Sequence, residues 1–144
     1  MNFFKMLFYD HILDIHNLYS EYKKETAKNN FDIGYEVAFR DALDIIEKIL
    51  KERNVSGFSP NAQFNLDLDA KLKNEDMKCI IQEYIVSIIQ LHNKYLEKTY
   101  SLNSGRIFGY YEILNMLKNK ILSFRCKKYC KNEYIQVLKF LENN

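Results

Sequence analysis

Residues that interrupt regular structure are scarce in this chain. Its 144 residues contain a single proline, Pro60, and only four glycines. A fold made of many short strands needs turn residues about every 8–12 positions. The scarcity therefore excludes an all-β fold and predicts an all-α protein.

Cysteines and long apolar runs are also few. The three cysteines, Cys79, Cys126 and Cys130, are an odd number without the spacing of a disulfide framework, which indicates reduced thiols. No apolar run approaches the roughly 20 residues of a membrane span. The aromatic start of the chain is followed directly by Asp10 and His11, where a signal peptide would need a small-residue cleavage site. We therefore expect a cytoplasmic protein without membrane contact.

The sequence contains an internal repeat. Residues 15–19, Ile-His-Asn-Leu-Tyr, are answered by residues 91–95, Leu-His-Asn-Lys-Tyr, at an offset of 76 positions (92 − 16). After each copy a glycine opens a helical pattern, Gly34 in the first half and Gly105 in the second, at an offset of 71 (105 − 34). The spacing predicts two duplicated αα-hairpins whose connections differ by five residues (76 − 71).

Apolar residues recur at alternating steps of three and four, which is the stripe of a helix packed on one side. With 47% apolar residues, the chain is able to bury one core, so we expect a single helical domain over residues 1–144. Asp32 is expected to cap the second helix, and Asn103 or Ser104 the fourth. The predicted bundle of about five helices comprises hairpin 1 at about 3–53, a connecting loop at 54–73, hairpin 2 at about 74–124 and a C-terminal helix at about 132–142.

Small residues mark the place where the hairpins are expected to meet. Gly34, Ala38 and Ala42 are spaced four apart, and Gly105 and Gly109 match them in part in the second half. Glycine inside a helix costs about 0.5–1 kcal/mol relative to alanine, so Gly109 should allow a close contact in return. We expect a tight packing of two helices here; the alternative is the seam of a homodimer.

Arrangements of residues that would carry out catalysis are missing. Of the three histidines, His11, His16 and His92, the last two occupy matching repeat positions, so they are not expected to assemble with a nucleophile. Cys126 and Cys130 lie four apart, which does not complete a zinc site, and no His-Glu-x-x-His spacing exists. The sequence predicts a protein that is not an enzyme and holds no metal or cofactor. A small enzyme using His16 and His92 is the weaker alternative.

Charge is divided unevenly between the halves. Residues 1–72 carry 9 basic and 12 acidic side chains, a net −3, and residues 73–144 carry 12 basic and 7 acidic, a net +5. No acid occurs between Glu112 and Glu133, where Phe124 and Tyr129 are interleaved with cations. This segment indicates either nucleic-acid contact or a solvated helix end. Its cations are Lys118, Lys120, Arg125, Lys127, Lys128 and Lys131.

Acidic side chains are expected along the outer face of the second helix. This face suits a basic protein partner that associates quickly through charge, although a solvated face is the plainer interpretation. Phe58 and Phe64 give the neighbouring connecting loop apolar surface for the same contact. The predicted acidic contacts are Glu36, Asp41, Asp44 and Glu47.

One helix carries a resemblance to known proteins. The segment 105–114 reads Gly-Arg-Ile-Phe-Gly-Tyr-Tyr-Glu-Ile-Leu, in which Gly105, Arg106, Phe108, Tyr110, Tyr111, Glu112 and Leu114 form the pattern. It resembles a helix of small helical proteins from low-GC bacteria and their prophages, and the whole chain is similar in style to the helical immunity proteins of toxin systems. The first copy departs from the pattern at Arg40 and Asp41, which stand where the second has Tyr111 and Glu112.

The sequence therefore leads to two hypotheses of function. The first is an immunity or antitoxin-type inhibitor that neutralises a toxin by direct protein contact. The alternative is a nucleic-acid-binding accessory or regulatory protein that uses the basic segment 118–131.

Overall fold

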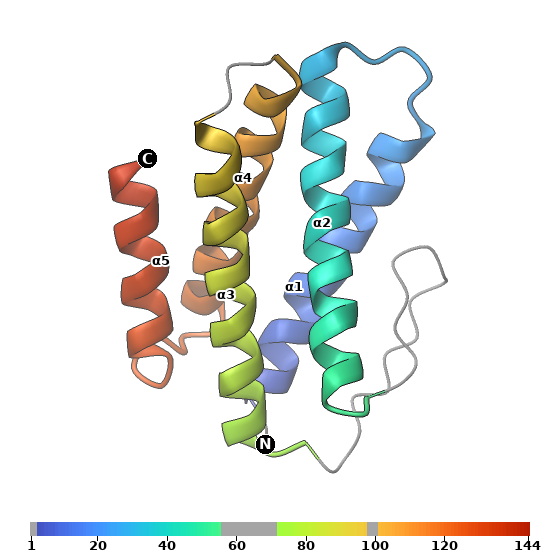
Figure 1. The fold of residues 1–144 in the computed structure, drawn as a ribbon. Coiled ribbons are helices and arrows are strands. Elements are labelled where there is room, and N and C mark those ends of the chain that lie inside the picture. The colour runs from blue at the N-terminus through green and yellow to red at the C-terminus, as the bar shows by residue number, and fades with distance from the viewer. Residues whose placement is uncertain (1–2, 56–71, 98–100) are drawn as a thin grey trace.

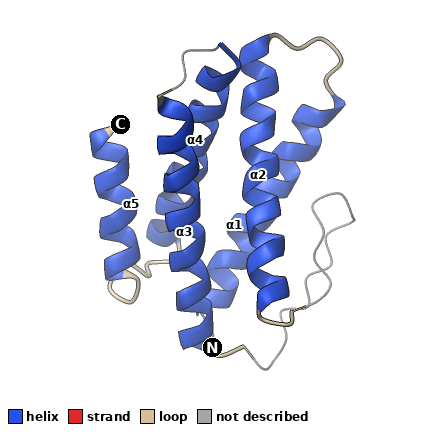
Figure 2. Cartoon of the chain, in the orientation of Figure 1, coloured by secondary structure: helices blue, strands red, loops and turns tan. Residues whose placement is uncertain are grey.

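The computed structural model describes residues 3–55, 72–97 and 101–144, and within these ranges it consists of five α-helices and no strand (Figures 1 and 2). The predicted all-α bundle is confirmed. Among the described helices, none is long and apolar enough to cross a bilayer. The helices are α1 (Phe3–Lys24), α2 (Asn30–Glu52), α3 (Asn74–Leu96), α4 (Ser101–Ser123) and α5 (Lys131–Asn143).

Successive helices run in opposite directions, so that α1, α3 and α5 point one way and α2 and α4 the other (Figure 1). The pair α2 and α4 packs more extensively than any other described pair. Helix α5 lies on the outside, against α4 and α3. The lower end of the bundle in Figure 1 therefore brings together the start of α1, the end of α4 and the start of α5.

The helix ends differ in detail from the prediction. Helix α2 is capped by Asn29, whose side-chain oxygen accepts a hydrogen bond from the Asp32 amide at 2.8 Å. The predicted cap by Asp32 was wrong, because Asn29 already satisfies a free amide of the first turn. Helix α4 begins at Ser101, so Asn103 lies inside the helix and is buried. The connecting loop predicted at 54–73, with Phe58 and Phe64, falls mostly outside the described residues.

The glycines of α4 allow this helix to lie very close to α2. A β-carbon added at Gly109 would lie 2.4 Å from the β-carbon of Ala38, and one added at Gly105 would lie 1.9 Å from the backbone oxygen of Phe31. Both distances are far too short for real atoms, so only glycine fits. The close helix packing predicted from the small residues is thus present within one chain, between α2 and α4.

Burial repeats along the chain as a duplication requires. Seven of the eight buried positions of α2 have a buried counterpart in α4 at an offset of 71 (105 − 34), and the exception is Ile49, whose counterpart Lys120 is half-buried. Both helices also end in a Schellman motif, with Asn54 and Arg125 in the left-handed region at φ 60° and 54°. The matching pairs are Gly34 and Gly105, Ala38 and Gly109, Phe39 and Tyr110, Ala42 and Ile113, Leu43 and Leu114, Ile46 and Leu117, and Leu50 and Ile121.

The first helices of the hairpins match at another offset than the sequence predicted. The buried stripe of α1 recurs in α3 at 73 (84 − 11), which pairs His11 with Tyr84 and Tyr19 with His92. His16 is only half-buried, so its expected equivalence with His92 was wrong. The predicted offset of 76 was based on two short segments of similar sequence. The structure instead aligns the two helices by the residues that each buries in the core.

Equivalent residues of the two copies touch at two places. Ala38 contacts Gly109 between α2 and α4, and the His11 Nε2 atom lies 2.7 Å from the Tyr84 hydroxyl between α1 and α3. Matching positions meet in this way only near a two-fold axis. The bundle therefore has a pseudo-two-fold axis that relates hairpin to hairpin, and α5 lies outside this symmetry.

Candidate binding surfaces

Asp41 does not face solvent as the sequence analysis expected. Its Oδ2 atom accepts hydrogen bonds from Arg106 Nη2 at 2.7 Å and Nε at 3.2 Å, and from the Tyr110 hydroxyl. The Arg106 guanidinium carbon also lies 3.7 Å from the centre of the Tyr95 ring. The Asp41 and Arg106 side chains are only 21% and 19% exposed. Asp41 therefore joins α2 to α4, and its assignment to an outer, partner-binding face is corrected.

The other three acids predicted as partner contacts on α2 each lie close to a cation of the same chain. Glu36 forms an ion pair with Lys28 at 2.7 Å and Glu47 with Lys51 at 3.2 Å. Asp44 lies 4.0 Å from Arg40, and both side chains are more than half exposed. Because neighbouring cations compensate these carboxylates, the α2 face has a weaker field than its sequence suggested.

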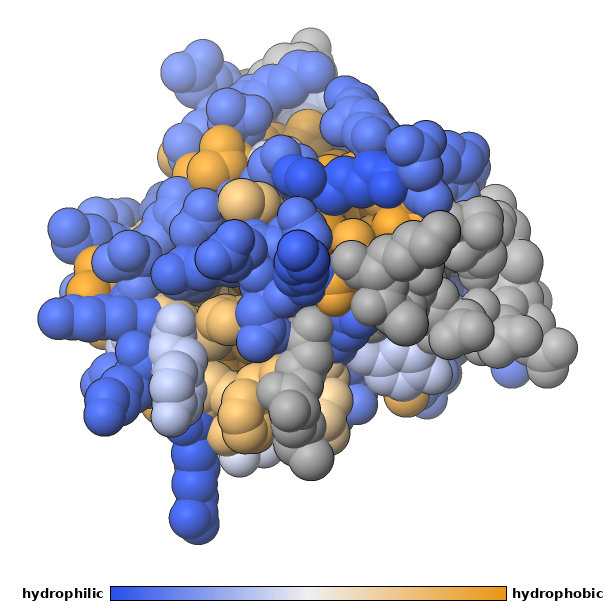
Figure 3. Space-filling model, turned by 90° about the horizontal axis from the view of Figure 1, so that it is seen from below, coloured by the Kyte–Doolittle hydropathy of each residue, from blue (hydrophilic) through white to orange (hydrophobic). Residues whose placement is uncertain are grey.

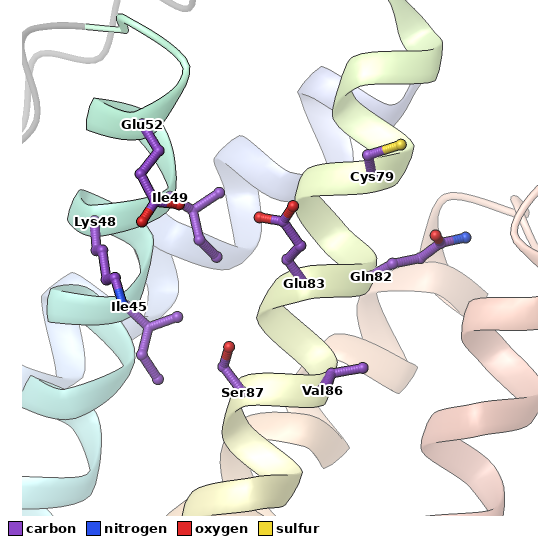
Figure 4. Close-up of a pocket in the computed structure, with 9 residues that line it drawn as sticks. All are labelled: Ile45, Lys48, Ile49, Glu52, Cys79, Gln82, Glu83, Val86 and Ser87. Carbon is purple, nitrogen blue, oxygen red and sulfur yellow. The ribbon is translucent and has the colours of Figure 1, made fainter.

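A groove of about 550 Å³ runs between α2 and α3 (Figure 4). Ile45, Ile49 and Val86 supply its apolar surface, and Val86 is 39% exposed. Charged side chains line its edges, and an ion pair of 2.7 Å between Arg53 and Glu83 ties the end of α2 to α3. The remaining lining residues are Lys48, Glu52, Cys79, Gln82 and Ser87.

A second depression, of about 530 Å³, lies where α4 turns into α5. We call its four cations, Arg125, Lys127, Lys128 and Lys131, the basic turn; with Leu122 they line the depression. All four are exposed. This end of the bundle is seen in Figure 3, where hydrophilic side chains surround apolar patches.

The backbone explains why these cations face outward together. The Arg125 amide donates to Leu122 at 3.0 Å and the Cys126 amide to Ile121 at 3.1 Å, which closes α4. Cys126 and Cys130 then point into the core at 2% exposure each, and burial raises the pKa of the Cys130 thiol to about 12. With the two cysteines inside, the intervening side chains and Lys131 are left at the surface.

None of the four cations of the basic turn forms an ion pair with a carboxylate of the described residues. Lys127 instead lies 4.7 Å above the centre of the Tyr134 ring. The other two predicted cations do not join the set. Lys120 pairs with Asp14 at 2.7 Å, and Lys118 is half-buried and does not line the depression.

These cations are not a requirement of the repeated fold. At the offset of 71, Arg125, Lys127, Lys128 and Lys131 stand where the first copy has the uncharged residues Asn54, Ser56, Gly57 and Pro60. Both copies fold into the same helix with the same Schellman end. The cations of the basic turn therefore have no counterparts in the first copy at this offset.

Two of the histidines, His11 and His92, are buried against aromatic side chains. His11 is fully buried beside Tyr84 and Phe8, and burial, aided by Lys120, lowers its pKa to about 3. His92 packs edge-on against Phe140, with ring centres 4.8 Å apart, and burial lowers its pKa too. Within the described ranges, no group of three or more histidine, cysteine, aspartate or glutamate side chains is arranged to hold a metal ion.

Comparisons with protein-family models, with curated proteins and with solved structures find nothing that matches this chain. The resemblance to immunity proteins therefore stays a prediction. The candidate surfaces are assigned from geometry and charge.

Proposed function

We propose that this protein binds a phosphate-bearing polyanion through the basic turn. Nucleic acid is the polyanion that we propose first. The observation that carries this proposal is the convergence of four cations on one depression without a carboxylate partner among the described residues. Clustered lysine and arginine bind phosphates mainly by releasing the counterions condensed around them. Three free cysteines fit the cytoplasmic location that we propose with it.

Salt dependence is the first signature of such binding. Each phosphate contact on a single strand contributes about −0.7 to the slope of log K against log salt. If each of the four cations of the basic turn meets a phosphate, the slope should be about −3.

The test is a binding titration of labelled oligonucleotides at several salt concentrations. The double variant Lys127→Glu with Lys128→Glu should bind about tenfold or more weakly and show a shallower slope. The matched control is Lys24→Glu with Lys94→Glu, which changes net charge equally at the opposite end of the bundle. Equal weakening in both double variants, or none in the first, would contradict the proposal.

A second candidate function is that of an immunity-type inhibitor, which acts by binding another protein. The groove between α2 and α3 supports this hypothesis. An apolar floor between charged edges suits an amphipathic helix of a partner. Val86 is central to this test because it is 39% exposed and is not part of the buried core.

The groove hypothesis is tested by affinity capture from the source cell after nuclease treatment. Val86→Glu should abolish capture of one stoichiometric protein that the unaltered chain retains. Ile135→Glu on α5, where the exposed fraction is 37%, is the matched control and should retain it. Capture that survives Val86→Glu would exclude the groove as the contact.

A further inference from the structure

An exposed aromatic pair borders the basic turn. Tyr129 follows Lys128 directly and is 61% exposed, the highest fraction among the large hydrophobic side chains of the described residues. The Phe3 ring, from the start of α1, stacks on it with ring centres 6.2 Å apart and an angle of 8° between the planes. Phe3 itself is 44% exposed. The pair brings together residues from opposite ends of the sequence beside the four cations.

The stacking holds the Tyr129 ring in place while leaving most of it accessible. The Tyr129 amide donates to the Cys126 carbonyl at 2.9 Å, which fixes the backbone of the turn. The Phe3 ring lies nearly parallel to the Tyr129 ring in an offset contact, and this contact leaves 61% of Tyr129 exposed to solvent. An aromatic ring that is already oriented loses little conformational freedom when a flat ligand stacks on it.

We infer that the polyanion is single-stranded nucleic acid and that Tyr129 is the platform on which one of its bases stacks. This inference rests on the proposed function. Bases in a duplex are stacked on each other and are not available to a side chain, whereas a single strand offers phosphates and free base faces together. Leu122, 44% exposed at the depression, adds an apolar contact for sugar or base.

The same features set this ligand apart from other polyanions. Polyphosphate can form ion pairs with the four cations, but it has no aromatic ring that could stack on Tyr129. Duplex DNA has phosphates but hides its base faces. An anionic bilayer surface attracts both cations and aromatics, so it is included in the test as a competing ligand.

The variants are Tyr129→Leu, which removes the ring, and Tyr129→Phe, which keeps it. Stacking of one base is worth a factor of about 5 to 100 in affinity. Tyr129→Leu should therefore weaken binding of single-stranded DNA and RNA of one sequence by that factor, whereas Tyr129→Phe should leave it nearly unchanged. Binding of inorganic polyphosphate should be equal in all three proteins, and the matching duplex should bind more weakly than the single strand. Thermal melting of each variant verifies the fold.

The outcomes separate the inference from the proposed function. If the lysine reversals weaken binding but Tyr129→Leu does not, or if duplex binds as tightly as single strand, the inference is overturned and the proposed function stands. If no polyanion binds, both are overturned. Tighter binding to vesicles of anionic lipid than to any oligonucleotide overturns both in favour of a membrane surface.

Discussion

Two aspartates three positions apart on α2 have different surroundings. Asp41 is hydrogen-bonded to Arg106 and Tyr110 on α4, while Asp44 is 4.0 Å from Arg40 and largely exposed. A carboxylate held by several partners in a half-buried site is costly to remove, because the partners lose their hydrogen bonds. An exposed ion pair on one helix contributes little.

We expect Asp41→Ala to lower the free energy of unfolding by about 1–3 kcal/mol. Asp44→Ala should change it by less than about 0.5 kcal/mol. Urea denaturation of both variants, read by circular dichroism, tests the difference. Equal stability of the two variants would show that the hydrogen bonds of Asp41 contribute no more than an exposed pair.

At the scale of elements, the contact between α2 and α4 decides how the hairpins pack. Ala38 and Gly109 lie against each other at equivalent positions, and a second β-carbon, added at Gly109, would lie 2.4 Å from that of Ala38. Helix propensity alone would favour alanine at position 109 by about 1 kcal/mol. The close approach reverses that preference, because a second methyl group would force the helices apart.

Gly109→Ala should therefore destabilise the protein by about 1–3 kcal/mol in spite of its better helix propensity. The double variant Ala38→Gly with Gly109→Ala moves the single methyl group to the other helix and should return close to the original stability. Thermal and urea unfolding measure both. A Gly109→Ala protein as stable as the original, or no recovery in the double variant, would refute the tight contact.

The turn between α4 and α5 is held by contacts from several parts of the chain. The two buried cysteines fix its inner side, and Phe3 reaches it from α1. The acid-free run of cations was visible in the sequence, but two of the six predicted cations take other positions. Lys120 of α4 instead forms an ion pair with Asp14 of α1. No pattern within one helix predicts such a contact between helices.

For the whole molecule, the pseudo-two-fold axis brings His11 and Tyr84 together in the core. The folded state keeps His11 neutral, with a pKa of about 3, while an unfolded histidine has its ordinary pKa of 6.5. Below about pH 6.5 the unfolded chain therefore binds a proton that the folded chain does not. Stability should fall as pH decreases from about 6.5 to about 3.

The expected slope from His11 is up to about 1.4 kcal/mol per pH unit in that range. His92 contributes in the same direction, because burial lowers its pKa as well. The measurement is urea unfolding from pH 7 to pH 4 for the original protein and for His11→Gln. The variant should lose the His11 part of the slope; parallel curves for the two proteins would contradict the burial of His11 in its neutral form.

Much of the architecture could be read from local patterns. The spacing of apolar residues predicted five helices, the glycines predicted the tight packing of α2 and α4, and the acid-free segment predicted four of the cations that meet. These features depend on the periodicity of one helix or on composition. The helices and the basic segment can be predicted without knowing which helices become neighbours.

Tertiary structure alone decided the rest. It turned Asp41 inward to Arg106, placed Phe3 on Tyr129, and matched His11 rather than His16 with the second hairpin. Each of these contacts joins residues at least 65 positions apart, as the 65 between Asp41 and Arg106 illustrate. By itself, the sequence determined the helices, their duplication and where positive charge accumulates. Packing determined which charged and aromatic side chains stay accessible, because exposure depends on the neighbours that the fold supplies.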